Sequence, residues 1–315
     1  MKSTLISRFP DQLRIAIEIA RRSILQKAVN PIYNVVICGL EGAGIEGTIV
    51  KELVQGEATV PIELIKDYSL PAYVNENSLI ICTSYSGYTE ETLEAFIQAK
   101  VRKAHLICIS SDGKLLELAK KRHFDTIKLP PGFSQRSGLG HSLTQLLWIL
   151  EFHRICSPSL HLINSSAELL ESNQSTIRLE ANTIADLIFN KTPVIYSTLS
   201  NEGVSINLRQ QLNENAKILC WQHVIPEMKL NEGGWSKHYP KSAVLIFRER
   251  IEYARNDLRL DFCKRNISKY SNTVIEIFPK GFAPLEKKLY WIHMADWIAW
   301  YVSRKLCVNA SIKED

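Results

Sequence analysis

Residues 78–92 run Ser-Leu-Ile-Ile-Cys-Thr-Ser-Tyr-Ser-Gly-Tyr-Thr-Glu-Glu-Thr, and they give the clearest indication of the class of fold. Its apolar first part predicts a buried strand, its hydroxyl-rich middle a turn, and its last residues the start of a helix. Ser84, Ser86 and Thr89 precede that helix start, where about four backbone N–H groups have no partner within the helix. Such a site favours an anion, for example a phosphate group. In the alternative interpretation, Ser86 or Thr89 only caps the helix.

The pattern of strand, turn and helix recurs along both halves of the chain. The strands predicted in the first half are residues 33–38, 61–65, 78–82, 104–109 and 126–129. Those predicted in the second half are residues 193–197, 218–221, 242–247 and 273–278. Strands that alternate with helices form doubly wound, mostly parallel sheets. We therefore predict an α/β protein with two such domains, residues 1–157 and 191–315, joined by a helical connection over residues 158–190.

The composition excludes several classes of protein. The formal net charge of +5 is mild and spread along the chain, so it gives no reason to expect nucleic acid as a partner. No stretch approaches the roughly 18 consecutive apolar residues of a membrane helix, and the first residues lack the apolar core of a secretory signal. The seven cysteines lie mostly in apolar runs, which is typical of reduced, buried thiols. We expect a cytoplasmic protein that binds no metal ion and does not associate with a membrane.

A glycine-rich segment, residues 39–47, follows the first predicted strand, and its composition predicts a loop. Its spacing matches the dinucleotide-binding fingerprint at Gly42, Gly44 and Gly47. The fingerprint also expects an acidic residue roughly 20 positions further on, and Glu63 and Asp67 lie there. Glu41 and Glu46, however, place carboxylates in the segment, which disfavours a pyrophosphate. Because the signals conflict, a nucleotide-dependent dehydrogenase is kept only as an alternative function.

Several motifs together resemble the bifunctional phosphoglucose/phosphomannose isomerase family, whose chains contain two sugar-isomerase (SIS) domains. The motifs are the glycine-rich segment 39–47, Lys-Asp-Tyr-Ser-Leu-Pro at 66–71, the serine-rich turn 84–92, Gln-Arg-Ser at 135–137 and Gln-Leu-Asn-Glu-Asn-Ala-Lys at 211–217. The resemblance implies a homodimer that binds sugar phosphates in an active site shared between domains and subunits, without any cofactor. It further implies interconversion of glucose 6-phosphate or mannose 6-phosphate with fructose 6-phosphate through an enediolate.

The resemblance also implies roles for individual residues. The phosphate-binding residues that it implies are Ser84, Ser86, Thr89, Gly42 and Gly44. Arg136 lies at the sugar and stabilises the enediolate, and Glu214 moves the proton between C1 and C2. These residue types suit the reaction, which needs a carboxylate base, a nearby cation and a fixed phosphate. Taken as single residues, Glu214 also fits a solvated carboxylate at a helix end, and Arg136 a partner of a nearby carboxylate.

Some positions depart from the family pattern around the expected phosphate site. Glu41, Ala43 and Glu46 stand where the family has a glycine, a serine and a glycine. The substitutions remove a hydroxyl and add two carboxylates, which we expect to repel a phosphate. Tyr88 stands where the family has asparagine, and we expect it to narrow the site.

A further departure concerns the chemistry. Leu230 stands where the family has the histidine that opens the sugar ring, and leucine transfers no proton. His238 or His223 would have to replace that histidine, and Lys313 is the candidate for the C-terminal active-site lysine of the family. These differences predict reduced activity. They also leave open a catalytically weakened protein that binds sugar phosphates or regulates in response to them.

Overall fold

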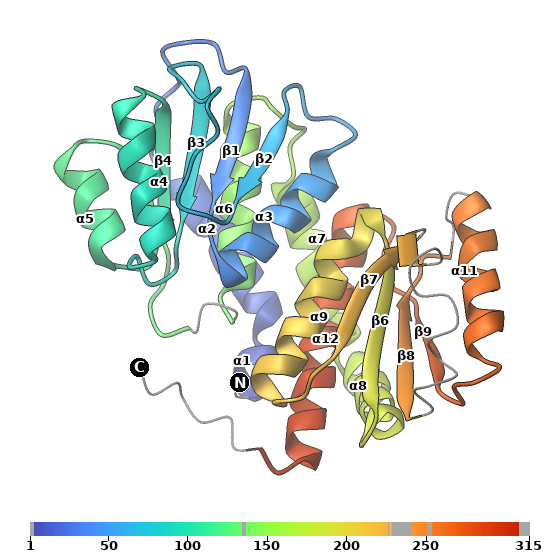
Figure 1. The fold of residues 1–315 in the computed structure, drawn as a ribbon. Coiled ribbons are helices and arrows are strands. Elements are labelled where there is room, and N and C mark those ends of the chain that lie inside the picture. Colours follow the sequence, from blue (N-terminus) through green and yellow to red (C-terminus); the bar gives the residue numbers. More distant parts are fainter. Residues whose placement is uncertain (1–2, 134–136, 226, 229–240, 251–253, 309–315) are drawn as a thin grey trace. The chain divides into compact units, whose positions relative to one another are not determined.

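The structure is a computed structural model that describes residues 3–133, 137–225, 227–228, 241–250 and 254–308 (Figure 1). The chain divides into two compact units: Arg8–Ala167, here the N-terminal unit, and Glu168–Asp315 with the first seven residues, here the C-terminal unit. Each contains one parallel sheet with helices, so the predicted class of two doubly wound α/β domains is confirmed. The domain limits at residues 157 and 190 stay a prediction. Within the described ranges, no helix has the length and apolar character that a membrane crossing requires.

Five parallel strands form the sheet of the N-terminal unit, in the order β2-β1-β3-β4-β5. The strands are β1 (Asn34–Cys38), β2 (Ile62–Ile65), β3 (Ser78–Thr83), β4 (His105–Ser110) and β5 (Asp125–Lys128). One helix layer contains α2 (Phe9–Arg22), α3 (Glu41–Val54) and α6 (Leu139–Phe152), and the other contains α4 (Glu90–Val101) and α5 (Gly113–Lys121). The strand order reverses between β1 and β3. Ligands of such sheets bind at this switch point, outside the carboxyl ends of the strands.

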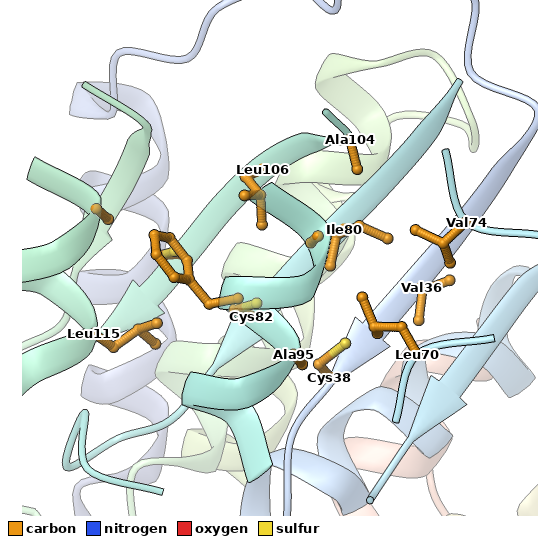
Figure 2. Packing of buried hydrophobic residues seen from close by; sticks show 14 residues of the cluster. Val36, Cys38, Leu70, Val74, Ile80, Cys82, Ala95, Ala104, Leu106 and Leu115 are labelled. Carbon is orange, nitrogen blue, oxygen red and sulfur yellow. The ribbon is translucent and has the colours of Figure 1, made fainter. Parts of the chain in front are cut away.

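Alternate residues of the central strands point toward α4 and α5 and form a buried apolar cluster (Figure 2). Cys38, Cys82 and Cys108 belong to it and are neighbours in register across β1, β3 and β4. The pKa of Cys38 is raised by its hydrogen bond with Cys82 and by burial. These thiols are free and buried, as predicted, whereas Cys307 is free and exposed.

Four parallel strands form the sheet of the C-terminal unit, in the order β7-β6-β8-β9. The strands are β6 (Thr192–Thr198), β7 (Trp221–Ile225), β8 (Ser242–Phe247) and β9 (Val274–Ile277). The helices are α1 (Ser3–Ser7), α8 (Gln174–Ile188), η1 (Leu199–Asn201), α9 (Glu202–Asn215), α11 (Ala254–Ile267) and α12 (Pro284–Lys305), and α7 (Leu160–Ser172) leads from one unit into the other. Both α8 and α9 pack against α12, as α2 and α3 pack against α6. The order α2-β1-α3-β2-β3 thus recurs as α8-β6-α9-β7-β8.

Two predicted elements differ from the structure. The glycine-rich segment is mostly helical, because α3 begins at Glu41. The strand predicted at 218–221 lies instead at Trp221–Ile225. Lys217 has a left-handed φ of 56° after the end of α9, and Asn213 Nδ2 donates to the Ile218 carbonyl at 2.7 Å. The residues after α9 therefore form a turn, and the strand starts later.

Candidate functional site

The serine-rich turn joins the carboxyl end of β3 to α4, beside the β1/β3 switch point. The Ser84 side chain is buried, and its Oγ lies 2.8 Å from Thr89 Oγ1. The Gly87 N–H donates to the same Ser84 oxygen at 3.1 Å, and Ser86 Oγ accepts from the Tyr88 N–H at 3.3 Å. The structure therefore brings the Ser84 and Thr89 hydroxyls together at a helix start. Thr89 is the N-cap of α4 but makes no side-chain cap hydrogen bond, so capping is the wrong interpretation of its hydroxyl.

The turn after β4 packs directly against the serine-rich turn. Gly87 has a φ of +77°, and a Cβ at this position would lie 2.0 Å from the Asp112 carbonyl oxygen. Glycine is therefore required there for conformation and for space. Ser111 Oγ donates to the Tyr85 carbonyl at 2.7 Å, and the Leu115 N–H donates to the Gly87 carbonyl at 3.0 Å. Two successive turns at the carboxyl edge of the sheet thus fix each other.

Tyr85 connects the serine-rich turn to the segment that follows β5. Its hydroxyl donates to the Pro130 carbonyl at 2.7 Å and accepts from the Phe133 N–H at 2.9 Å. Tyr88 has a different environment: its side chain is exposed and lies against the start of α5, where a Cβ at Gly113 would approach its ring within 2.9 Å. Tyr88 therefore contacts the turn after β4.

The glycines of the glycine-rich segment serve packing in this structure. Gly42, Gly44 and Gly47 all lie within α3, whereas the dinucleotide fingerprint needs its first glycine in the tight turn before the helix. This placement argues against the dehydrogenase alternative. A Cβ at Gly39 would lie 2.9 Å from the Thr83 carbonyl oxygen, so the ends of β1 and β3 approach closely. The phosphate-binding role of Gly42 and Gly44 stays a prediction.

The two carboxylates of the segment differ in their environment. Glu46 is buried, and a hydrogen bond from Ser142 of α6 reaches its carboxyl group. Burial raises the pKa of Glu46 well above its ordinary value, and the Ser142 bond only partly opposes this shift. Burial therefore favours the neutral form of the Glu46 carboxyl group, and the expectation that Glu46 repels a phosphate stays a prediction. Glu41, the first residue of α3, has a left-handed φ of 50°.

In the C-terminal unit, Glu214 is partly buried in the last turn of α9. Its neighbour Asn215 donates through Nδ2 to Gln211 Oε1 at 2.5 Å, and Gln211 Nε2 donates to Asp296 Oδ1 of α12 at 2.7 Å. Burial raises the pKa of Asp296 to about 8, although the Gln211 bond opposes the shift. Gln211 and Asn215 stand in the motif quoted above, whereas no sequence signal points to Asp296, which lies in an apolar helix without a recognisable motif.

Lys288, also missed from the sequence, holds the other end of α9. It is buried in α12, and its Nζ donates to the Ser200 carbonyl and to Asn201 Oδ1, the latter at 3.0 Å. Ser200 and Asn201 belong to the turn between β6 and α9. This turn corresponds in topology to the glycine-rich segment of the N-terminal unit.

Comparison with known proteins identifies the family. A model of the SIS domain matches residues 58–137, and a model of the bacterial phospho-glucose isomerase C-terminal SIS domain matches residues 177–311. A bifunctional phosphoglucose/phosphomannose isomerase of Aquifex aeolicus is 31% identical over 284 residues, which cover 89% of this chain and 87% of the relative. The chain belongs to the bifunctional phosphoglucose/phosphomannose isomerase family. The Caldicellulosiruptor bescii family member is 30% identical over 307 residues, covering 93% of this chain and 90% of its own.

Similarity extends beyond the phosphoglucose/phosphomannose isomerases. A D-glucosamine-6-phosphate 4-epimerase of Sulfolobus acidocaldarius is 28% identical over 195 residues, or 62% of this chain and 61% of the epimerase. A crystal structure from Clostridium difficile 630, described as a phosphosugar isomerase, superposes with a TM-score of 0.76 at 16% identity and covers 99% of this chain and 95% of its own. The latter similarity shows a shared fold.

The structure describes only some of the remaining residues that were predicted from the phosphoglucose/phosphomannose isomerase pattern. Arg136, Leu230, His238 and Lys313 lie outside the described residues. His223 lies in β7 with its Nε2 3.8 Å from the Glu227 carboxylate. No cluster of His, Cys, Asp or Glu suited to a metal ion occurs in the part of the chain that the structure describes.

Proposed function

We propose that the chain interconverts glucose 6-phosphate or mannose 6-phosphate with fructose 6-phosphate through an enediolate. The observation that carries the proposal is the pairing of the Ser84 and Thr89 hydroxyls at the start of α4, in a chain of a sugar-phosphate isomerase family. A phosphate dianion accepts hydrogen bonds both from hydroxyls and from the N–H groups of a helix's first turn. The serine-rich turn provides both kinds of donor.

Glu214 is the base in this proposal. The isomerisation moves a proton between C1 and C2, and a positioned general base accelerates such a step by about 10²- to 10⁴-fold. Arg136 supplies the positive charge that stabilises the enediolate, and His238 is the candidate acid for ring opening. A homodimer with a shared active site belongs to the same proposal. The reaction as written transfers no electrons to a partner, so the proposal includes no cofactor.

A coupled assay of fructose 6-phosphate formation tests the proposal with wild type and Ser84→Ala. We expect Ser84→Ala to weaken sugar-phosphate binding by about 10-fold or more, because a hydrogen bond to a charged group contributes about 1.5–3 kcal/mol. Ser166→Ala is the matched control, since this buried hydroxyl bonds the Leu162 carbonyl of its own helix. A folded wild type without turnover of either sugar would refute the proposal.

The alternative is a protein that binds sugar phosphates but turns them over weakly or not at all. Leu230 in place of the ring-opening histidine favours it. Calorimetric titration with glucose 6-phosphate, mannose 6-phosphate and glucosamine 6-phosphate separates the two functions. Saturable binding without turnover supports the alternative. Glucosamine 6-phosphate belongs in the panel because one relative is an epimerase of that sugar.

A further inference from the structure

The end of α9 is fixed by a chain of hydrogen bonds that starts in the interior of the C-terminal unit. Asp296 and Gln211 are both buried residues, 8% and 1% exposed respectively. Gln211 uses both ends of its amide, donating to Asp296 at 2.7 Å and accepting from Asn215 at 2.5 Å. Gln211 and Asn215 are four residues apart and therefore lie on the same face of α9. The chain of hydrogen bonds thus runs from Asp296 of α12 to Asn215, the last residue of α9.

In the sequence, Glu214 lies between Asn215, at the end of this chain of hydrogen bonds, and Asn213, which makes a second contact. It precedes Asn215 and is three residues after Gln211, so it borders the buried face of α9. On the other side, Asn213 Nδ2 donates to the Ile218 carbonyl at 2.7 Å and closes the turn after the helix. Both sequence neighbours of Glu214 are therefore held by side-chain hydrogen bonds. The backbone that carries Glu214 is therefore fixed on both sides.

We propose that Asp296 is a positioning residue, which places the Glu214 carboxylate for proton transfer through Gln211 and Asn215. The inference rests on the proposed function, in which Glu214 is the base. Burying a carboxyl group costs free energy, and an apolar residue would fill the same place in α12 without that cost. A base displaced by as little as 1 Å loses about 100-fold in rate. The hydrogen-bond chain therefore serves the geometry of the reaction.

Three variants test this inference by separating the hydrogen bond from the charge. Asp296→Asn keeps an acceptor oxygen for Gln211, and we expect a kcat within about 3-fold of wild type. Asp296→Ala removes the acceptor, and we expect kcat to fall by about 10- to 100-fold. We expect KM for glucose 6-phosphate to change by less than about 3-fold, because in the proposed function the serine-rich turn, and not α9, binds the phosphate. Asn215→Ala, at the less buried end of the chain, should also lower kcat.

Ser303→Ala is the matched control. Ser303 is buried in α12, and its hydroxyl donates to the Trp300 carbonyl of its own helix at 2.7 Å. The variant removes a buried polar group from the same helix, so it should keep the kcat of the wild type. Thermal unfolding of all variants identifies those that fold. If Asp296→Ala fails to fold, the kcat values of Asn215→Ala and Asp296→Asn still test the positioning role.

The outcomes are distinguishable. A wild-type kcat in Asp296→Ala and Asn215→Ala, or equal losses in Asp296→Ala and Ser303→Ala, overturns the positioning role while isomerase activity stands. An Asp296→Asn variant as impaired as Asp296→Ala also overturns it. If Glu214→Gln keeps full activity, or the folded wild type has none, the proposed function fails and the positioning role fails with it.

Discussion

Helices α3 and α9 occupy the same place in the two units, since each joins the first strand of its sheet to the edge strand beside it, but they are held by different means. The start of α3 is held by close packing, with Gly39 against Thr83 and Ala43. The start of α9 is held by the buried ammonium group of Lys288. Polar groups in a low-dielectric interior specify one arrangement more strictly than apolar packing does, provided that they are paired.

The difference extends along the two helices. Asp296 of α12 reaches the last turns of α9 through Gln211, so α12 holds α9 at both ends. In the other unit, α6 reaches α3 through the bond between Ser142 and Glu46. The helix that has buried polar contacts at both ends, here called polar clamps, is the one that carries the proposed base, Glu214. The shared topology therefore determines where a helix lies, while individual side chains determine how strictly it is held.

The largest expected effect comes from the buried acid of α12. The pKa of Asp296 is about 8 in the folded protein against an ordinary value of 3.8. Between these pH values the folded state holds a proton that the unfolded state has lost, so raising the pH destabilises the fold. One such group contributes about 1.4 kcal/mol per pH unit. The stability of Asp296→Asn relative to wild type should therefore rise by up to about 4 kcal/mol between pH 5 and pH 8.

Urea unfolding at several pH values measures this difference. Asp11→Asn, at an exposed carboxyl in α2, is the matched control for removal of a charge. A relative stability of Asp296→Asn that stays constant from pH 5 to pH 8 would contradict the prediction. It would also mean that no buried acid distinguishes the way α9 is held from the way α3 is held.

Removal of the other clamp should have the next largest effect. Lys288→Met deletes the donor to the Ser200 carbonyl and to Asn201 Oδ1, and buried acceptors without a donor are costly. We expect a loss of about 3 kcal/mol in the free energy of unfolding. The neighbouring variant Lys287→Met is the control, since the Lys287 ammonium group bonds the partly exposed Glu249 and should contribute about 1 kcal/mol or less. Equal losses in both variants would show that Lys288 is no clamp.

The corresponding change at the start of α3 tests close packing. A Cβ at Gly39 would lie 2.7 Å from Ala43 Cβ and 2.9 Å from the Thr83 carbonyl oxygen. Because the second contact is with backbone, Gly39→Ala forces the ends of β1 and β3 apart, at a cost of about 2 kcal/mol. Gly56→Ala is the control, since a Cβ there meets no described heavy atom within 4 Å. An unchanged free energy of unfolding in Gly39→Ala would mean that packing at Gly39 does not hold the start of α3.

The features predicted correctly from the sequence are those that depend on neighbouring residues. Strands such as β3 and β8 follow from short apolar runs between turns, and the meeting of Ser84 with Thr89 depends on one local turn. Asp296 and Lys288 were missed because their partners lie 85 and 87 residues away. The burial of Glu46 was missed for the same reason, because it arises from packing between elements that are distant in the sequence. The glycine-rich segment was mistaken for a loop because glycine favours turns, although here it permits close packing of a helix.

The smallest expected effect concerns the first residue of α3. Glu41 has a φ of +50°, a conformation that costs a residue with a Cβ about 1–2 kcal/mol and costs glycine almost nothing. At an ordinary helix position, alanine is more stable than glycine by about 1 kcal/mol. At residue 41 this order should reverse, with Glu41→Gly about 1 kcal/mol more stable than Glu41→Ala. Because both variants lose the same carboxylate, their difference in denaturant unfolding isolates the backbone. Glu52, inside α3, gives the matched pair, for which alanine should be the more stable; the same order at both positions would mean that residue 41 carries no strain.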